Sequence, residues 1–293
     1  RVESTGRSAV KLTFASWNIS ALNRLRDQAA LLRHLAWDVV ALQEVNEAAF
    51  EHLVKEVKPT SSAFSLRLPP RIRADAVRRR CGCAVLTRSR FAIKASTLLK
   101  SAPLPERALL AEVEGEVGEV KVWSVHVPPG VNWERRKPET FVALARAFQA
   151  QDGPALVGLD ANAPKTDHPD IEQNEGWWDE EPDLLGPKPL HPLRDVLRDR
   201  LSREPDRFRL VRRLRPCGPL ELSHVRGTVR KVPCRYDFIL ASQEFTVLDV
   251  KYLYQDAIAA GSDHALLAAE LSVTSWTAAS SVGPSKSASP DYS

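Results

Sequence analysis

The segment PALVGLDAN, residues 154–162, decides the fold of this chain. Its apolar run from Pro154 to Leu159 is short enough for a buried strand, and the run stops at Asp160. Asn162 follows two positions later, so the predicted strand carries a carboxylate and a nearby amide at its end. An Asp-X-Asn sequence is also common in ordinary turns, so this segment alone does not separate a functional site from a structural turn.

Apolar segments that lead into a polar side chain recur along the rest of the chain. Alternation from Leu12 predicts a strand that reaches Asn18. The apolar run from Asp38 to Leu42 predicts a buried strand that ends at Glu44. Each polar residue has an ordinary structural interpretation on its own, such as a turn or a helix cap. Together with Asp160 and Asn162, the candidate site residues of this kind are Asn18, Glu44, His126, Asp237, Asp263 and His264.

Helices are expected between these strands. Apolar residues recur at helical spacing over 25–35, 46–57 and 141–148, with Asn46 as an N-cap and Pro59 as a stop signal. The sequence Glu-Gly-Glu-Val-Gly at 114–118 separates two apolar segments as a hairpin turn would. Strands outnumber helices and several pair as hairpins. This pattern favours packed sheets with helices on the outside over a purely parallel, doubly wound sheet.

Length and composition favour one domain, over residues 11–275. The ends, 1–10 and 276–293, are polar or rich in Ser, Ala and Pro, so we expect them to be disordered. The hydrophobic content of 43% is ordinary, and no apolar run approaches the roughly 18 residues that a membrane span needs. We therefore expect a monomer without a transmembrane segment, in the cytoplasm, with N-terminal processing left open.

The arginine-rich stretches and one long loop each have more than one interpretation. The net charge of +4 permits a polyanionic substrate without requiring one. Arginines crowd residues 67–90 and 194–215, and either run has a solvated surface as its alternative. Arg79, Arg80 and Arg235 are the predicted substrate contacts. The loop over 163–192 contains Trp177 and Trp178, and it is either disordered or functional, as a lipid-contacting segment or a lid.

The polar residues suggest metal and phosphate chemistry. Asp237 lies inside an apolar segment, so a buried carboxylate there needs a partner, and the Asp263-His264 pair is the natural one. Carboxylate and amide oxygens suit Mg²⁺ or Mn²⁺, whereas Cys81 and Cys83 lack the second spaced pair of a zinc ribbon. A hard metal ion together with histidines indicates reactions at phosphate.

Six motifs in order carry a resemblance to a known family. They look like the successive signatures of the endonuclease/exonuclease/phosphatase superfamily, and the chain resembles its metal-dependent nuclease branch. That resemblance implies an α/β fold, a four-layer α-β-β-α sandwich of two mainly antiparallel sheets flanked by helices. The motifs are Ser16-Trp17-Asn18-Ile19-Ser20, Leu42-Gln43-Glu44-Val45, Ser124-Val125-His126-Val127-Pro128, Gly158-Leu159-Asp160-Ala161-Asn162, Arg235-Tyr236-Asp237-Phe238-Ile239 and Ser262-Asp263-His264.

The resemblance also implies a set of metal ligands and a group that acts on the attacking water. Glu44 resembles the principal metal ligand, with Asn18 and Asp263 beside it. The implied ion is Mg²⁺, with Mn²⁺ as the alternative. Asp160 resembles the group that orients or deprotonates the attacking water, and Asn162 would hold this water or a phosphate oxygen.

The remaining implied roles concern charge on the phosphate. His264, paired with Asp237, would stabilise the negative charge that develops on phosphorus. His126 would contact the phosphate or help the leaving oxygen depart. The implied reaction is an in-line displacement without a covalent enzyme intermediate.

Two positions depart from members of the family that act on abasic DNA. Ser20 stands where many of them have an acidic residue, and Pro128-Pro129 stands where they have Pro-Asn. These differences disfavour abasic-site repair. The segment 193–198 resembles a helix with Asp and Arg that is common in the nuclease members, and an amphipathic surface helix explains it equally well.

Three functions remain open at this point. The preferred one is a nuclease that cleaves DNA or RNA, because the arginine-rich stretches could follow a phosphate backbone. The alternatives are a phosphatase or phosphodiesterase that acts on a small-molecule or lipid phosphate, and an inactive binding domain. The sequence does not distinguish DNA from RNA, endonucleolytic from exonucleolytic cleavage, or one metal ion from two.

Overall fold

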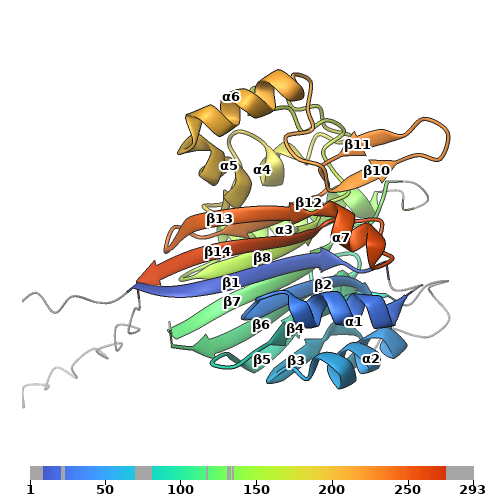
Figure 1. The fold of residues 1–293 in the computed structure, drawn as a ribbon, viewed down its shortest axis with the longest axis vertical. Helices are drawn as coiled ribbons and strands as arrows, with labels where there is room; N and C mark the ends of the chain where they lie inside the picture. The colour runs from blue at the N-terminus through green and yellow to red at the C-terminus, as the bar shows by residue number, and fades with distance from the viewer. Residues whose placement is uncertain are drawn as a thin grey trace, which may run out of the picture.

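Two six-stranded sheets pack face to face, and helices cover their outer faces (Figure 1). The structure, a computed structural model, describes residues 9–20, 24–69, 81–116, 118–130, 133 and 135–274. The four-layer sandwich predicted from the sequence is confirmed. Among the described residues, no helix combines the length and apolar composition that crossing a bilayer requires.

Each sheet is mainly antiparallel with one central parallel pair. The parallel pairs are β1 with β2 and β7 with β8. The first sheet contains, in spatial order, β13 (Phe245–Leu253), β14 (Leu266–Thr274), β1 (Ala9–Asn18), β2 (Val39–Val45), β4 (Gly82–Thr87) and β3 (Ser61–Phe64). The second contains β5 (Ala92–Leu98), β6 (Ala108–Gly115), β7 (Gly118–His126), β8 (Ala155–Asp160), β12 (Asp237–Ala241) and β9 (Arg194–Asp195).

Strand β1 shows how one segment joins two layers of the core. Leu12 and Phe14 belong to the apolar cluster between the sheets, whereas Ala15 and Trp17 belong to the cluster beneath α1 and α2. Alternate side chains of a strand point to opposite faces, so both faces of β1 are buried. Burial of each large apolar side chain stabilises the fold by about 1.5–3 kcal/mol. The end of the strand that carries Asn18 is therefore packed on both faces.

The helices confirm part of the sequence prediction. Asn46 caps α2 by accepting a hydrogen bond from the Ala49 N–H, and the helix ends at Lys58, just before Pro59. Hydrophobic periodicity did not predict β3, β5, α6, α7 or the hairpin of β10 (His224–Arg226) and β11 (Val232–Cys234). The helices are α1 (Leu25–His34), α2 (Glu47–Val57), α3 (Arg136–Gln149), α4 (Pro182–Leu185), α5 (Val196–Ser202), α6 (Pro205–Leu214) and α7 (Tyr254–Ala259).

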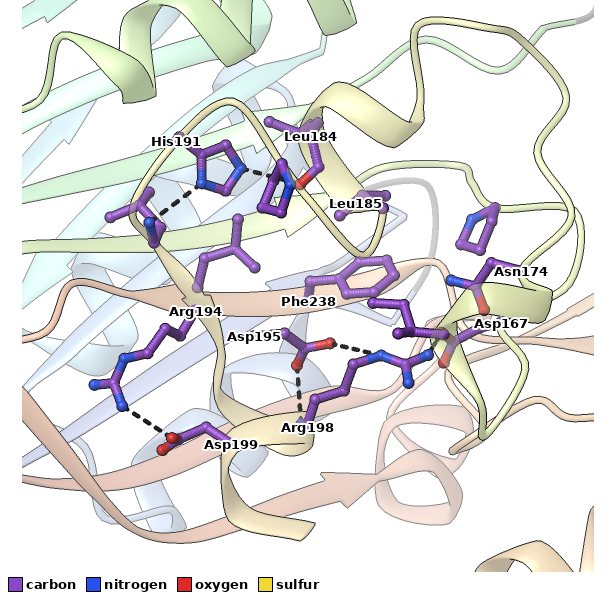
Figure 2. Close-up of a pocket in the computed structure, with 16 residues that line it drawn as sticks. Asp167, Asn174, Leu184, Leu185, His191, Arg194, Asp195, Arg198, Asp199 and Phe238 are labelled. Atoms are coloured by element: carbon purple, nitrogen blue, oxygen red, sulfur yellow. Dashed lines mark hydrogen bonds and ion pairs between the residues drawn. The ribbon is translucent and has the colours of Figure 1, made fainter. Parts of the chain in front are cut away.

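The loop over 163–192 has a defined course through the structure. It borders a cavity of about 310 Å³ whose charged side chains point toward one another (Figure 2). Asp167 forms ion pairs with Arg198 and Arg235, and the imidazole of His191 lies 3.0 Å from the carbonyl oxygen of Leu184. These contacts join the loop to α5 and β12. The alternative of a disordered loop is therefore excluded.

The predicted chain ends lie mostly outside the described residues. Ala9 and Val10 form the start of β1, although the sequence placed them in a disordered segment over 1–10. They pair with Val273 and Thr274 of β14, and these backbone hydrogen bonds explain why the strand begins early. Residues 1–8 and 275–293 are not described.

Candidate active site

Three polar side chains form a row across adjacent strands of the second sheet. In the strand register, Asp160 of β8 lies opposite His126 of β7 on one side and Asp237 of β12 on the other. All three side chains are buried. Asn18, at the end of β1 in the other sheet, donates a hydrogen bond from Nδ2 to Oδ2 of Asp160 at 2.7 Å. The structure thus brings residues that are far apart in the sequence to one edge of the sandwich.

A polar seam between the sheets supports this arrangement. Nε2 of Gln43 lies 3.3 Å from the hydroxyls of Ser16 and Ser124 and 3.3 Å from the carbonyl oxygen of Gly158. Gln43 is buried, and the sequence analysis did not select it although it precedes Glu44. Its neighbours come from both sheets, so the seam fixes the distance between the strands that carry Asn18 and Asp160.

Asn162 has a backbone conformation that ordinary residues rarely adopt. Its φ is 49°, in the left-handed region, and such positions cost on the order of 1–3 kcal/mol. Three contacts hold it there. Its backbone N–H donates to Oδ1 of Asp160, its Nδ2 donates to the carbonyl oxygen of Val127, and its own carbonyl accepts from Nζ of Lys137 at 2.7 Å.

Lys137 is a functional candidate that the sequence analysis missed. Its side chain is 2% exposed, and Nζ lies 3.6 Å from a carboxylate oxygen of Glu181. Burial lowers the pKa of Lys137, an effect that the Glu181 carboxylate opposes. No local motif reveals this residue, because it acts on the backbone of Asn162 from the first turn of α3.

Glu44 also has a left-handed backbone, with φ at 54°. Its side chain is 29% exposed, and Oε1 lies 3.5 Å from Nε2 of His126. It therefore faces the opening of the site, while the row of Asp160 and its neighbours forms the buried floor.

His264 and Asp237 form a buried ion pair, as the sequence predicted. Nδ1 of His264 lies 2.9 Å from Oδ2 of Asp237. Burial lowers the pKa of His264, but the carboxylates of Asp237 and Asp160 outweigh this effect and raise the pKa to about 10. The side chain is thus a cation at neutral pH, next to the carboxylate that fixes its ring orientation.

His126 has the opposite electrostatics. Burial lowers its pKa well below the ordinary value, and the nearby charges of Arg107 and His264 lower it further. Nη1 of Arg107 lies 3.4 Å from Nδ1 of His126, and its guanidinium stacks over the ring of Trp133. His126 is therefore a neutral imidazole at neutral pH. Arg107 was missed, and the only signal in the sequence is a charged residue at the start of a predicted strand.

Asp160 is poised between its two protonation states. Burial raises its pKa to about 7, the cation of His264 and the Asn18 hydrogen bond oppose this, and the Asp237 and Glu44 carboxylates add to it. Such a crowd of carboxylates fits a site that holds a cation, because a nearby positive charge favours their ionised forms. Asp160, Asp237 and His264 also place potential ligand atoms within 4.8 Å of one another, although His264 can ligate a metal ion only after it loses its proton.

Not all predicted site residues point into this cluster. Asp263 is exposed, and its backbone carbonyl lies 3.0 Å from Nδ1 of His224. Its carboxylate belongs to a second group of potential metal-ligand atoms, with His224 and His264. Arg79 and Arg80 lie outside the described residues.

Arg235 has a different role from the substrate contact predicted for it. Its side chain is fully buried, and its guanidinium donates two hydrogen bonds to Asp195 and one to Asp167. Nε donates to the hydroxyl of Tyr252, and the group lies over the ring of Phe238. These contacts occupy the donors, so Arg235 holds the loop over 163–192 to the sheet instead of facing a substrate.

The comparisons with known proteins show the family and the fold of the chain. The model of the Endonuclease/Exonuclease/phosphatase family matches residues 15–264. The chain belongs to this family. The match begins in β1 and ends at His264, so it includes all the predicted site residues and strands of both sheets. Members of the endonuclease/exonuclease/phosphatase family hydrolyse phosphate esters. No curated protein matches the chain.

Solved structures with low sequence identity have the same fold. TDP2 from D. rerio, complexed with single-strand DNA product, has a TM-score of 0.63 and 16% identity, over 89% of this chain and 98% of that chain. The Xenopus laevis APE2 catalytic domain has a TM-score of 0.60 and 18% identity, over 89% and 92%. A family protein from Bacteroides thetaiotaomicron has a TM-score of 0.60 and 13% identity, over 91% and 99%.

Proposed function

We propose that this protein is a divalent-metal-dependent nuclease that hydrolyses phosphodiester bonds of DNA or RNA. The observation that carries the proposal is the buried row of Asp160 and Asp237 with the cationic His264, linked to the opposite sheet by Asn18. The nucleic-acid substrate is supported by one fold neighbour, the TDP2 structure with a single-strand DNA product.

Asp160 and Asn162 would orient and deprotonate the attacking water. With a pKa of about 7, Asp160 is partly ionised at neutral pH and can accept a proton from a water molecule beside it. Asn18 already donates to one of its oxygens, which leaves the carboxylate in a fixed orientation. Asn162, held by Lys137, would keep the water or a phosphate oxygen in line with the bond that breaks.

The two histidines would act on the phosphate in different ways. His264 is a fixed cation, so it would stabilise the negative charge that develops on the non-bridging oxygens. His126 is neutral and would donate a hydrogen bond to the phosphate or to the leaving oxygen. In neither case does the protein need to form a covalent bond to the substrate.

Glu44, with Asn18, would hold Mg²⁺, or Mn²⁺ as the alternative, whereas Asp263, the third ligand predicted from the sequence, lies in a separate group with His224 and His264. Their oxygen donors fit a hard cation, and no cysteine belongs to the groups of potential ligands among the described residues. When bound, such an ion supplies Lewis acidity and a template for the phosphate.

The test is to incubate the protein with single- and double-stranded DNA, RNA and a small phosphodiester, with Mg²⁺ or EDTA. Glu44→Gln and His264→Ala should lose activity, and losing such a group typically costs about 10²–10⁴ in rate. Asp152→Asn is the matched control, because this carboxylate is 89% exposed and precedes the opposite end of β8. Cleavage of the polymers should weaken steeply with added salt, since contacts with the backbone release counterions.

Two outcomes would overturn the proposal. Hydrolysis of the small ester alone would favour a phosphodiesterase. Activity that survives in both site variants would place the chemistry elsewhere.

A further inference from the structure

An aromatic pocket of about 450 Å³ lies beside the candidate active site. It lies between the loop over 163–192 and the β10–β11 hairpin, which projects from the edge of the two sheets (Figure 1). Asn162 and Lys137 are shared with the candidate active site, but the aromatic side chains of the pocket have no role assigned above. The residues that line it and matter here are Asn162, Trp177, Trp178, His224, Arg226 and Tyr236.

The pocket adjoins the residues of the candidate active site. Asn162, which the proposed mechanism places beside the water or the phosphate, also lines the pocket. The ring of His224 stacks on that of His264, with centroids 4.4 Å apart and an angle of 27° between the planes. It also stacks on Tyr236, at 5.7 Å and 21°. A continuous stack of planar rings therefore leads from the catalytic imidazole to the wall of the pocket.

The two tryptophans are exposed although large aromatic side chains are usually buried. Trp177 and Trp178 are 40% and 37% exposed. The backbone at Trp177 is held in place, because its N–H donates to Oε2 of Glu181 at 2.9 Å, and Glu181 in turn pairs with the buried Lys137. An exposed ring on an anchored backbone suits ligand binding, since less conformational freedom is lost when a ligand covers it.

Charge around the pocket favours an anionic, planar ligand. The guanidinium of Arg226 lies over the ring of Trp177, with its carbon 4.7 Å from the centroid. The hairpin that carries Arg226 continues into the exposed residues Arg230 and Lys231. A planar ring attached to a phosphate chain matches this combination of apolar faces and adjacent cations.

We propose that this pocket receives the base of the nucleotide that carries the scissile phosphate, turned out of its stack and placed against Trp177. This inference rests on the proposed nuclease function and adds a substrate preference to it. Stacking on rings reads no base edge, so the enzyme would accept any base but would require it to be unpaired. It would therefore favour single-stranded or frayed ends over an intact duplex.

Steady-state kinetics on two matched single-stranded substrates test the proposal. The substrates are oligothymidylate and a chain of equal length built from abasic deoxyribose phosphates. For the wild-type protein, we expect a lower KM for the chain with bases. Base stacking is worth enough that Trp177→Ala should raise the KM for oligothymidylate by about fivefold to about a hundredfold, with a much smaller change in kcat. The ratio of the two KM values should then approach one.

Two variants control for indirect effects. Trp177→Phe keeps a ring and should restore most of the discrimination. Leu214→Ala removes a side chain that is 65% exposed on α6, and it should not alter the ratio of KM values. Equal KM values for the two chains in the wild-type protein would overturn the inference.

A direct binding measurement separates this inference from the proposed nuclease function. Thymidine monophosphate should quench tryptophan fluorescence in the wild-type protein, and deoxyribose 5-phosphate should not. The quenching should be lost in Trp177→Ala. If no polymer is cleaved but the nucleotide still quenches, the nuclease function fails and the pocket stands. If the nucleotide does not quench, the pocket assignment fails whatever the protein cleaves.

Discussion

The charge of His264 depends on the carboxylates around it, and on Asp237 above all. Its ring is buried, and burial alone would lower its pKa. Asp237, at 2.9 Å from Nδ1, contributes most of the opposing effect, with Asp160 next, and together they bring the pKa to about 10. The cation that the mechanism uses at neutral pH is thus a property of the pair and not of the histidine alone.

Replacing that carboxylate should change the pH dependence of the reaction. In Asp237→Asn, burial should dominate and the pKa of His264 should fall, so the imidazolium should lose its proton at a lower pH than in the wild-type protein. We expect a lower kcat at neutral pH and an alkaline limb of the kcat profile that moves toward acid pH. Measuring kcat between about pH 5 and pH 10 checks this. An unchanged alkaline limb would show that His264 does not act as a cation.

Lys137 is expected to act on catalysis through Asn162. Lys137→Met removes the hydrogen bond to the Asn162 carbonyl, and the left-handed backbone at that residue then has one fewer restraint. We expect kcat to fall by roughly tenfold or more, since small misplacements of a positioned group are costly.

A second variant separates positioning from stability in this pair. Glu181→Gln breaks the same buried ion pair but keeps the bond from Lys137 to Asn162. Both variants should lower the free energy of unfolding, measured with urea. If Glu181→Gln reduces kcat as strongly as Lys137→Met, the effect is structural and Lys137 has no positioning role.

At the scale of elements, the close approach of the two sheets sets the geometry of the site. A Cβ on Gly158 would lie 2.5 Å from Oγ of Ser16 and 2.6 Å from Cβ of Ala41, both in the opposite sheet. Gly158 is two residues before Asp160 on β8. Only glycine lets this strand approach β1 closely enough for Asn18 to reach Asp160.

Gly158→Ala should therefore reduce both stability and activity. Overpacking of this kind typically costs about 1–3 kcal/mol, and the shift of β8 should weaken the bond between Asn18 and Asp160. Gly153→Ala is the control, because Gly153 has open space around its Cβ but a φ of +65° that strains other residues. Thermal unfolding should show a loss in both variants, and the kinetic assay a loss in Gly158→Ala alone. Full activity in Gly158→Ala would contradict this account.

The sequence predicted the elements whose burial is regular. β2 and β8 are buried along almost their whole length and β1 along its second half, and α2 has both its cap and its stop residue in the sequence. β5 is mostly half-buried or exposed, and α6 has no buried residue, so neither gives a strong apolar pattern. Strand order also escaped prediction, because it depends on contacts between distant segments.

In the candidate site, too, local sequence patterns could be predicted and contacts between distant segments could not. Residues at strand ends were found from their local motifs, as with Asp160 and His264. Lys137 and Arg107 escaped because each acts through a partner far away in the sequence, a backbone carbonyl in one case and an imidazole in the other. Arg235 was selected from its motif, yet its guanidinium pairs with carboxylates from two other segments, which no local pattern reveals.

For the whole molecule, the acidic site contrasts with an overall basic chain. The net charge is +4, yet the site is acidic. Burial raises the pKa of Asp160, and the nearby carboxylates of Asp237 and Glu44 raise it further. Like charges that are buried together destabilise the folded state, and a bound cation relieves this repulsion. The unfolded chain holds no such arrangement of ligands, so a metal ion that binds the site should stabilise the fold.

Metal binding should accordingly be visible as a rise in the melting temperature. At a Mg²⁺ concentration about a hundredfold above Kd, the stabilisation is about 2.7 kcal/mol, which for a chain of this size corresponds to a shift on the order of 5 °C. Differential scanning fluorimetry with Mg²⁺, Mn²⁺ or EDTA measures the shift without depending on activity. Glu44→Gln should reduce it strongly, whereas Asp152→Asn, which removes an exposed carboxylate beyond the other end of β8, should leave it unchanged. An equal shift in all three proteins would mean that the ion binds elsewhere. If the wild-type protein shows no shift, no cation binds the acidic cluster and the prediction is wrong.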